Sequence, residues 1–179
     1  MTGRLIALIR GINVGRAKRV AMADLRALVE SLGYGDVRTL LNSGNVVFSA
    51  PGTFVNEAAA RIEQGLSAQL GVPACVTVIS AAELARIVED NTLGDIAHDP
   101  SRLLVAVLRN PDDRARLAPL AQQDWTPETL AIAGRAAYLW CPSGILASRL
   151  QDALNRTLGD GVTARNWTTI TKLHGIAQA

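Results

Sequence analysis

Two short runs of apolar residues, 5–9 and 103–108, constrain the fold of this chain more than any other feature. A short run without polar alternation is typical of a strand that is buried on both faces. Each run is followed by the same order of predicted elements, and the two copies are offset by roughly 98 residues. No residue identity accompanies this repeat, so element order alone predicts a duplicated architecture.

The first copy has the predicted order β-α-β-β-α-β. Gly33 and Gly71 follow two apolar stripes with helical spacing and are expected to end those helices. Thr53 is the expected N-cap of the second helix. The turn Asn42-Ser43-Gly44-Asn45 predicts a hairpin. The predicted strands are residues 5–9, 37–41, 46–48 and 76–79, and the predicted helices are residues 22–32 and 55–70.

A connecting helix and a turn-rich stretch separate the two copies. Ser80-Ala81-Ala82-Glu83 has capping-box spacing, which predicts a helix that continues to about Asp90. We place the domain boundary after this connection, between an N-terminal half, 1–98, and a C-terminal half, 99–179.

In the second copy, Pro111 is expected at the first turn of a helix that Pro119 bends or ends. The other predicted elements of this copy are strands 103–108, 129–133, 136–140 and 162–164, and helices 145–158 and 166–177.

This order predicts an α+β fold of two ferredoxin-like halves, each with helices on one face of a four-stranded antiparallel sheet. Because the first strand of each half is apolar on both faces, the two sheets are expected to pack together as one rigid unit. A chain of 179 residues can bury roughly 70% of its unfolded surface, so the core needs no disulfide or metal.

Composition excludes some classes of protein. The net charge of +2 is nearly balanced, so only a local charge distribution can indicate a polyanionic partner. Cys75 and Cys141 have no CxxC spacing and predict no disulfide framework. The first apolar run is too short for a signal peptide, and no window approaches the 18 apolar residues of a membrane span. We therefore expect a soluble cytoplasmic protein without membrane association.

The loop of residues 10–19 is the main candidate for a binding site. The first twenty residues contain five basic side chains and no acidic one, and the loop adds two glycines. Backbone N–H groups at a glycine turn, together with arginine, can hold a phosphate or a carboxylate. The loop matches neither the Walker motif nor G-x-G-x-x-G. The alternative interpretation is an ordered surface loop whose glycines serve backbone geometry.

Two further segments have polar groups suited to an anion. The 42–45 turn could present amides to a ligand or simply form a tight hairpin. Asn166 is a natural N-cap, so the start of the last helix, beside Arg165, is either an anion site or an ordinary cap. The anion-pocket hypothesis combines these segments with the first loop. Its residues are Arg10, Gly11, Asn13, Gly15, Lys18, Ser43, Gly44, Asn45, Arg165, Asn166 and Thr168.

Three separated segments resemble the bacterial family of unknown function DUF1697. They are Arg10–Gly15 with Met22, Leu25, Gly33-Tyr34 and Val37–Phe48; Ser148-Arg149-Leu150 behind Pro142-Ser143-Gly144; and Arg165–Leu173. The resemblance covers essentially the whole chain and implies a two-part α+β protein, but no activity. The chain departs from the family at Arg16, where a second glycine is frequent, at Ala21, where proline is usual, and at Arg149, where lysine is usual.

Groups suited to catalysis are scarce. His98 and His174 share no ligand spacing with each other or with either cysteine, so neither a metal site nor a cofactor is predicted. Cys75 is placed in an apolar strand and is interpreted as a small buried residue. Cys141 has no obvious base nearby in the sequence, so it is not expected to be a nucleophile either.

Three functions remain open. The first is a binding module for an anionic ligand, which would be a nucleotide, a nucleic acid or a phosphorylated metabolite. The second is an enzyme that acts on a phosphorylated or carboxylated small molecule, with Arg10 and Arg165 as the clamp. The third is a protein-interaction scaffold. The chain is expected to be a monomer or a homodimer.

Overall fold

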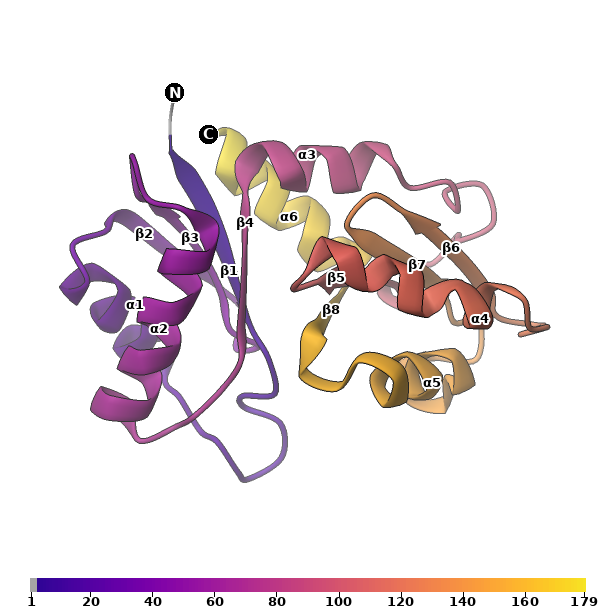
Figure 1. Cartoon of the computed structure of the whole chain (residues 1–179), viewed down its shortest axis with the longest axis horizontal. Coiled ribbons are helices and arrows are strands. Elements are labelled where there is room, and N and C mark those ends of the chain that lie inside the picture. Colours follow the sequence, from indigo (N-terminus) through magenta and orange to yellow (C-terminus); the bar gives the residue numbers. More distant parts are fainter. Residues whose placement is uncertain (1–2) are drawn as a thin grey trace. The chain divides into compact units, whose positions relative to one another are not determined.

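The computed structural model describes residues 3–179, which form two four-stranded antiparallel sheets and six α-helices (Figure 1). The predicted α+β class is confirmed. The chain divides into two compact units, one made of the residues up to Ala82 with Leu173–Ala179, the other of Glu83–Lys172. The domain boundary that we expected at residue 98 lies inside the second of these units.

The first unit contains the first predicted copy. Its strands are β1 (Arg4–Ile9), β2 (Gly35–Leu40), β3 (Asn45–Ser49) and β4 (Val76–Ser80), and its helices are α1 (Met22–Ser31) and α2 (Val55–Leu70). The strand order is β2-β3-β1-β4, and every neighbouring pair is antiparallel. This is the order expected for a split β-α-β arrangement.

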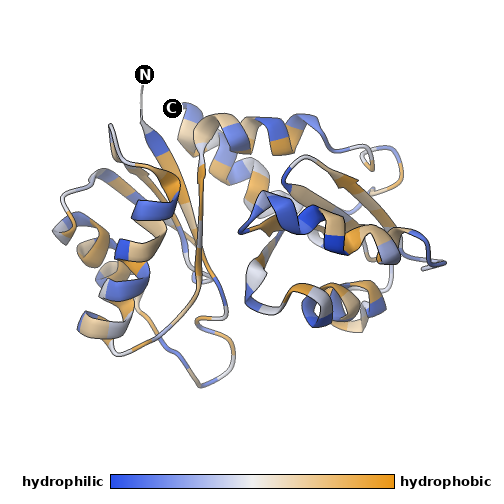
Figure 2. Ribbon diagram, viewed as in Figure 1, coloured by the Kyte–Doolittle hydropathy of each residue, from blue (hydrophilic) through white to orange (hydrophobic). Residues whose placement is uncertain are grey.

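Strand β1 is buried on both faces, as its apolar run predicted. Leu5, Ala7 and Ile9 belong to the hydrophobic core that also contains α1 and α2. Ile6 and Leu8, on the opposite face, have 0% exposure. Side chains alternate between the faces of a strand, so only an uninterrupted apolar run can fill both. Figure 2 shows the result: β1 is mostly in hydrophobic colours, whereas α2 alternates along its length.

Helices α1 and α2 pack closely at a glycine. A Cβ atom on Gly65 of α2 would lie 2.6 Å from Cδ1 of Leu28 in α1. Gly71 ends α2 with φ of +64°, as predicted. The expected N-cap was wrong: Phe54 is the N-cap residue, and no side chain caps the helix. Thr53 precedes the N-cap by one residue. It belongs to the preceding turn, where its N–H donates to the carbonyl of Ala50.

The second unit repeats the same sheet. Its strands are β5 (Leu103–Leu108), β6 (Thr129–Ala133), β7 (Ala136–Trp140) and β8 (Val162–Asn166), in the order β6-β7-β5-β8. Its helices are α3 (Ala81–Glu89, which begins in the first unit), α4 (Ala118–Ala121) and α5 (Arg149–Leu158). The helix predicted from Pro111 is a 3-10 helix, Pro111–Leu117, followed by α4, whose first turn contains Pro119. Proline suits a first helical turn because its nitrogen has no hydrogen to leave unpaired.

The core of the second unit has the same construction as that of the first. Leu104, Ala106 and Leu108 of β5 share a cluster with α5, and all six residues of β5 are buried. The Tyr138 hydroxyl donates to the carbonyl of Ile87 in α3 over 2.6 Å. The packing of the two sheets on each other stays a prediction.

The last helix, α6 (Trp167–Gln178), follows β8 without a loop. Strand β8 is longer than predicted and contains both Arg165 and Asn166. The end of α6 belongs to the first unit, where Nη1 of Arg4 donates to the carbonyl of Ile176 over 2.9 Å. No helix in residues 3–179 is long and apolar enough to cross a bilayer.

Candidate functional site

The first loop follows the C-terminal end of β1, next to the residues at which the antiparallel neighbours β3 and β4 begin. The N–H of Arg10 donates to the carbonyl of Cys75 over 2.8 Å, and the N–H of Ile9 donates to the carbonyl of Gly44 over 2.9 Å. Gly11 and Gly15 have φ of +72° and +64°, and both are exposed. The loop and the 41–44 turn therefore lie side by side, as the anion-pocket hypothesis required of these two segments.

Asn13 fixes the loop in one conformation. Its Nδ2 donates to the carbonyls of Val20, over 2.8 Å, and Asn42, over 2.7 Å. Its Oδ1 accepts from the N–H of Val20 over 2.8 Å, and its own N–H donates to the carbonyl of Lys18 over 3.0 Å. Asn13 was predicted as a ligand-binding residue. In the structure its side-chain amide closes the loop and ties it to the neighbouring turn.

The turn beside the loop is tightly packed. Gly44 is buried with φ of +86°, and a Cβ atom there would lie 2.9 Å from Cβ of Ile9. Asn45 has 0% exposure, and its Nδ2 donates to the carbonyl of Leu40 and to Oγ of Ser43, each over 2.8 Å. These residues hold the turn in place beside the loop. Their role at a binding site would be to position the backbone rather than to contact the ligand.

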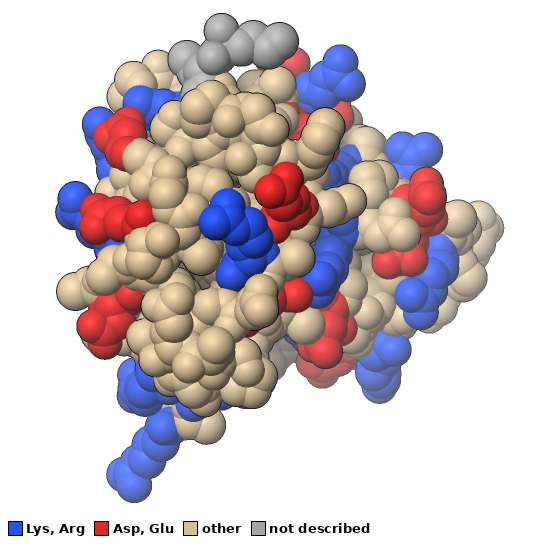
Figure 3. All heavy atoms as spheres, turned by 60° about the vertical axis from the view of Figure 1, so that its left-hand side comes forward, with Lys and Arg blue, Asp and Glu red and all other residues tan. Residues whose placement is uncertain are grey.

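Three basic side chains on the loop face solvent. Arg16, Lys18 and Arg19 are exposed and form no ion pair within residues 3–179. Arg10 is half-buried. By contrast, Arg4 and Arg38 in the same unit both contact the carboxylate of Asp36. Basic and acidic side chains are interspersed over most of the face in Figure 3, and a basic group projects at its lower left.

Two apolar side chains accompany these cations. Val14 is 72% exposed and Leu41 is 54% exposed. Val14 adjoins Asn13 and Leu41 adjoins Asn42 in the sequence, so the hydrogen bond from Asn13 to Asn42 places the two apolar residues on neighbouring turns. Sequence reasoning missed both. The only signal for Leu41 was an apolar residue just before a polar turn, which had been interpreted as the end of a strand.

The start of α6 is capped as predicted. Oδ1 of Asn166 accepts from the N–H of Thr169 over 2.9 Å. Arg165 lies on β8 opposite Val105 rather than on the helix, and its Nη1 donates to the carbonyl of Ala164 over 2.9 Å. Thr168 is half-buried in the first turn, where its carbonyl accepts from Oγ1 of Thr171. The convergence of these residues with the first loop stays a prediction.

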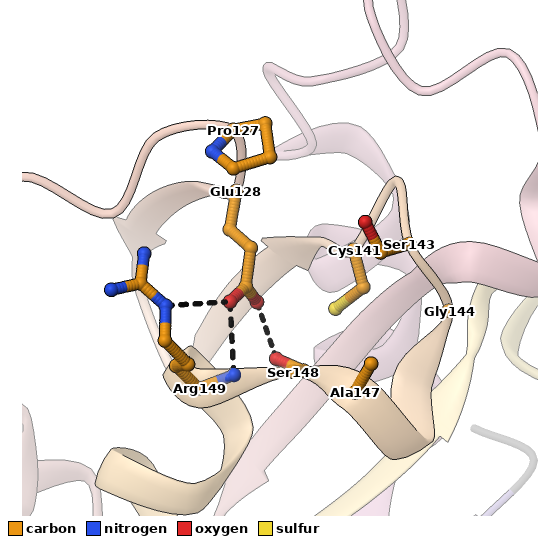
Figure 4. A pocket seen from close by; sticks show the side chains of 8 residues that line it. All are labelled: Pro127, Glu128, Cys141, Ser143, Gly144, Ala147, Ser148 and Arg149. Atoms are coloured by element: carbon orange, nitrogen blue, oxygen red, sulfur yellow. Dashed lines mark hydrogen bonds and ion pairs between the residues drawn. The ribbon is translucent and has the colours of Figure 1, made fainter.

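A concavity lies in the second unit at the start of α5 (Figure 4). It has a volume of about 130 Å³. The side chain of Glu128 in its wall is only 7% exposed. Its carboxylate accepts hydrogen bonds from the Ser148 hydroxyl and from the N–H of Arg149, the latter over 2.9 Å. The residues that line the concavity are Pro127, Glu128, Cys141, Ser143, Gly144, Ala147, Ser148 and Arg149.

This arrangement is a helix cap rather than a catalytic group. The Ser148 oxygen accepts from the N–H of Gln151 over 2.9 Å, so Ser148 and Glu128 together satisfy the first turn of α5. Burial raises the pKa of the neighbouring Cys141 thiol, and a hydrogen bond with Ser148 opposes that shift. A thiol that stays protonated near neutral pH is a poor nucleophile. Within residues 3–179, no group of His, Cys, Asp and Glu side chains is placed to hold a metal ion.

Comparison with known proteins identifies the family. The family model described as a protein of unknown function, DUF1697, matches residues 1–138. The chain belongs to DUF1697. The segments at Ser148 and Arg165 that resemble this family lie beyond the matched residues of the DUF1697 model.

Two individual proteins are similar to this DUF1697 chain. A curated tRNA modification GTPase MnmE of Prochlorococcus marinus (strain MIT 9313) is 33% identical over 132 residues, which are 72% of this chain and 27% of that protein. The chain thus spans about a quarter of that relative's length. The solved structure of a conserved bacterial protein from Streptococcus pneumoniae has a TM-score of 0.81 and 20% identity and covers 99% of both chains. This structural likeness supports the fold alone.

Proposed function

We propose that this DUF1697 protein binds an anionic ligand through the 10–19 loop, and that the ligand is RNA. The observation that carries the proposal is the set of exposed cations Arg16, Lys18 and Arg19, which have no acidic partner within the described chain. The Asn13 bonds hold the backbone that bears them in one conformation. A fixed basic loop can contact successive phosphates with little loss of backbone entropy on binding.

Two points favour RNA over a small phosphorylated metabolite. A small-molecule site encloses its ligand in a concavity, whereas these side chains stand on an exposed loop, which suits an extended polyanion. The curated relative that matches 132 residues of this chain is named as a tRNA modification GTPase. The match spans only part of that relative, so the name supports contact with RNA and says nothing of GTP hydrolysis here.

The test is the salt dependence of binding, measured by fluorescence anisotropy with labelled tRNA. Three phosphate contacts predict that log K falls with log salt concentration with a slope of about −2. The triple variant Arg16→Ala, Lys18→Ala, Arg19→Ala is expected to lose most of this slope and at least about tenfold in affinity at low salt.

The matched control removes three other exposed arginines, Arg86→Ala, Arg114→Ala and Arg156→Ala, and so lowers the net charge equally. Because the attraction is local, the control is expected to keep the affinity and the slope. Equal loss in both triple variants would overturn the assignment to this loop. No salt-dependent binding by the unmodified protein would overturn the function.

A further inference from the structure

Leu41, in the turn beside the basic loop, combines a strained backbone with an exposed apolar side chain, and both lower the stability of the fold. Leu41 has φ of +57°, in the left-handed region that Leu rarely adopts. Its side chain is also 54% exposed, so it gains little from burial. Asn or Gly would tolerate this backbone without exposing an apolar side chain. Strained backbone that persists on a surface is concentrated at binding sites.

Val14 is a second exposed apolar residue, on the turn next to that of Leu41. It is 72% exposed, and its neighbour Asn13 donates to the carbonyl of Asn42, the neighbour of Leu41. The two aliphatic side chains therefore project from two adjacent turns that Asn13 holds together. Arg16, Lys18 and Arg19 follow Val14 on the same loop. The two neighbouring turns thus combine exposed aliphatic side chains with basic side chains that form no ion pair within residues 3–179.

We infer that Val14 and Leu41 contact unstacked bases of the RNA while the three cations contact its phosphates, so that the protein selects RNA with unpaired nucleotides. This inference rests on the proposed function and names the class of RNA. Paired RNA hides its base faces within the stack, whereas unpaired loops expose them. That aliphatic side chains can contact base faces is known from DNA, where proteins insert leucine and similar side chains between base steps. The charge of the loop complements the backbone of the same ligand.

The experiment compares two labelled RNAs of equal length, a hairpin with a single-stranded loop and a fully paired duplex. Leu41→Asn is expected to lower affinity for the hairpin about tenfold, as loss of one buried leucine contact implies, and to leave duplex binding unchanged. Val14→Ser is expected to act in the same direction. The midpoint of unfolding of Leu41→Asn should equal or exceed that of the unmodified protein, because Asn accepts positive φ.

The matched control is Leu146→Asn, which removes a fully exposed leucine in the second unit and is expected to leave both affinities unchanged. If Leu41→Asn does not change the ratio of hairpin to duplex affinity while the Arg16, Lys18, Arg19 triple variant loses binding, the inference is overturned and the proposed function stands. If neither RNA binds with salt dependence, both are overturned.

Anionic vesicles that contain phosphatidylserine form a further arm of the experiment, because a basic loop with aliphatic tips also suits a lipid surface. Vesicle binding that Leu41→Asn abolishes, without an effect on RNA, would replace the inference with membrane contact.

Discussion

At the scale of single residues, Asn13 does more than its exposed neighbours to shape the candidate site. Its side chain makes three hydrogen bonds, two of them to Val20, directly after the loop, and one to the adjacent turn. Its φ of +56° lies in the region where Asn is tolerated better than most side chains. One residue therefore supplies both the backbone conformation and the bonds that hold it.

Two substitutions separate these contributions. Asn13→Gly keeps the backbone freedom and loses the side-chain bonds, so a loss of about 1–2 kcal/mol in free energy of unfolding is expected. Asn13→Ala also places a Cβ in the left-handed region and should cost about 1 kcal/mol more. Urea unfolding followed by circular dichroism measures both. If Asn13→Ala were as stable as the unmodified protein, the bonds would not hold the loop.

At the scale of elements, the 41–44 turn is held by close packing. Gly44 has positive φ and no room for a Cβ, whereas Gly71 has positive φ and open space around it. We expect Gly71→Ala to cost about 1–2 kcal/mol for its backbone conformation. Gly44→Ala should cost about 1–3 kcal/mol more, because Cβ of Ile9 cannot rotate away. Thermal unfolding of the two variants is the measurement, and equal costs would contradict this packing argument.

Helix α5 provides a second prediction at this scale. Replacement of Glu128 by Ala removes a buried carboxylate that accepts from the Ser148 hydroxyl and the Arg149 N–H, so a loss of about 2–3 kcal/mol is expected. Hydrogen exchange should quicken at the amides of Arg149 and Leu150, because both N–H groups donate to Oε1 of Glu128, over 2.9 and 3.4 Å. Glu89→Ala removes an exposed carboxylate and serves as the control. Unchanged exchange in Glu128→Ala would show that Ser148 alone caps the helix.

At the scale of the whole molecule, the two units have separate clusters of core residues. Helices α3 and α6 each contribute residues to both units. Short helical segments are marginal by themselves, so loss of the packing of one end of such a helix destabilises the other end. We therefore expect the chain to unfold in one transition.

The tryptophans make this testable. All three of them, Trp125, Trp140 and Trp167, belong to the second unit. Ile62→Ala, in the first core, is expected to cost about 2–5 kcal/mol and to lower the midpoint seen by tryptophan fluorescence as much as that seen by circular dichroism. Leu154→Ala, in the second core, is the control and should shift both signals. If Ile62→Ala left the midpoint measured by tryptophan fluorescence unchanged, the two units would unfold independently.

The sequence by itself determined the order and approximate bounds of the elements. Leu5–Ile9 and Leu103–Leu108 show why: burial on both faces requires an uninterrupted apolar run, and that run can be recognised from a few consecutive residues. Helix stops at Gly33 and Gly71 were predicted for the same reason, because one residue type meets a local backbone requirement.

Only the tertiary structure decided what Asn13 and Glu128 do, whereas the cap at Asn166 is local and was predicted. Asn13 bonds to a turn 29 residues away, and Glu128 caps a helix that begins 21 residues later. These hydrogen-bond partners depend on which strands pair and where each strand ends. The spacing of apolar residues in the sequence does not indicate which strands pair. The exposure of Val14 and Leu41 was hidden for the same reason, because an apolar residue in a sequence predicts burial until the packing around it is known.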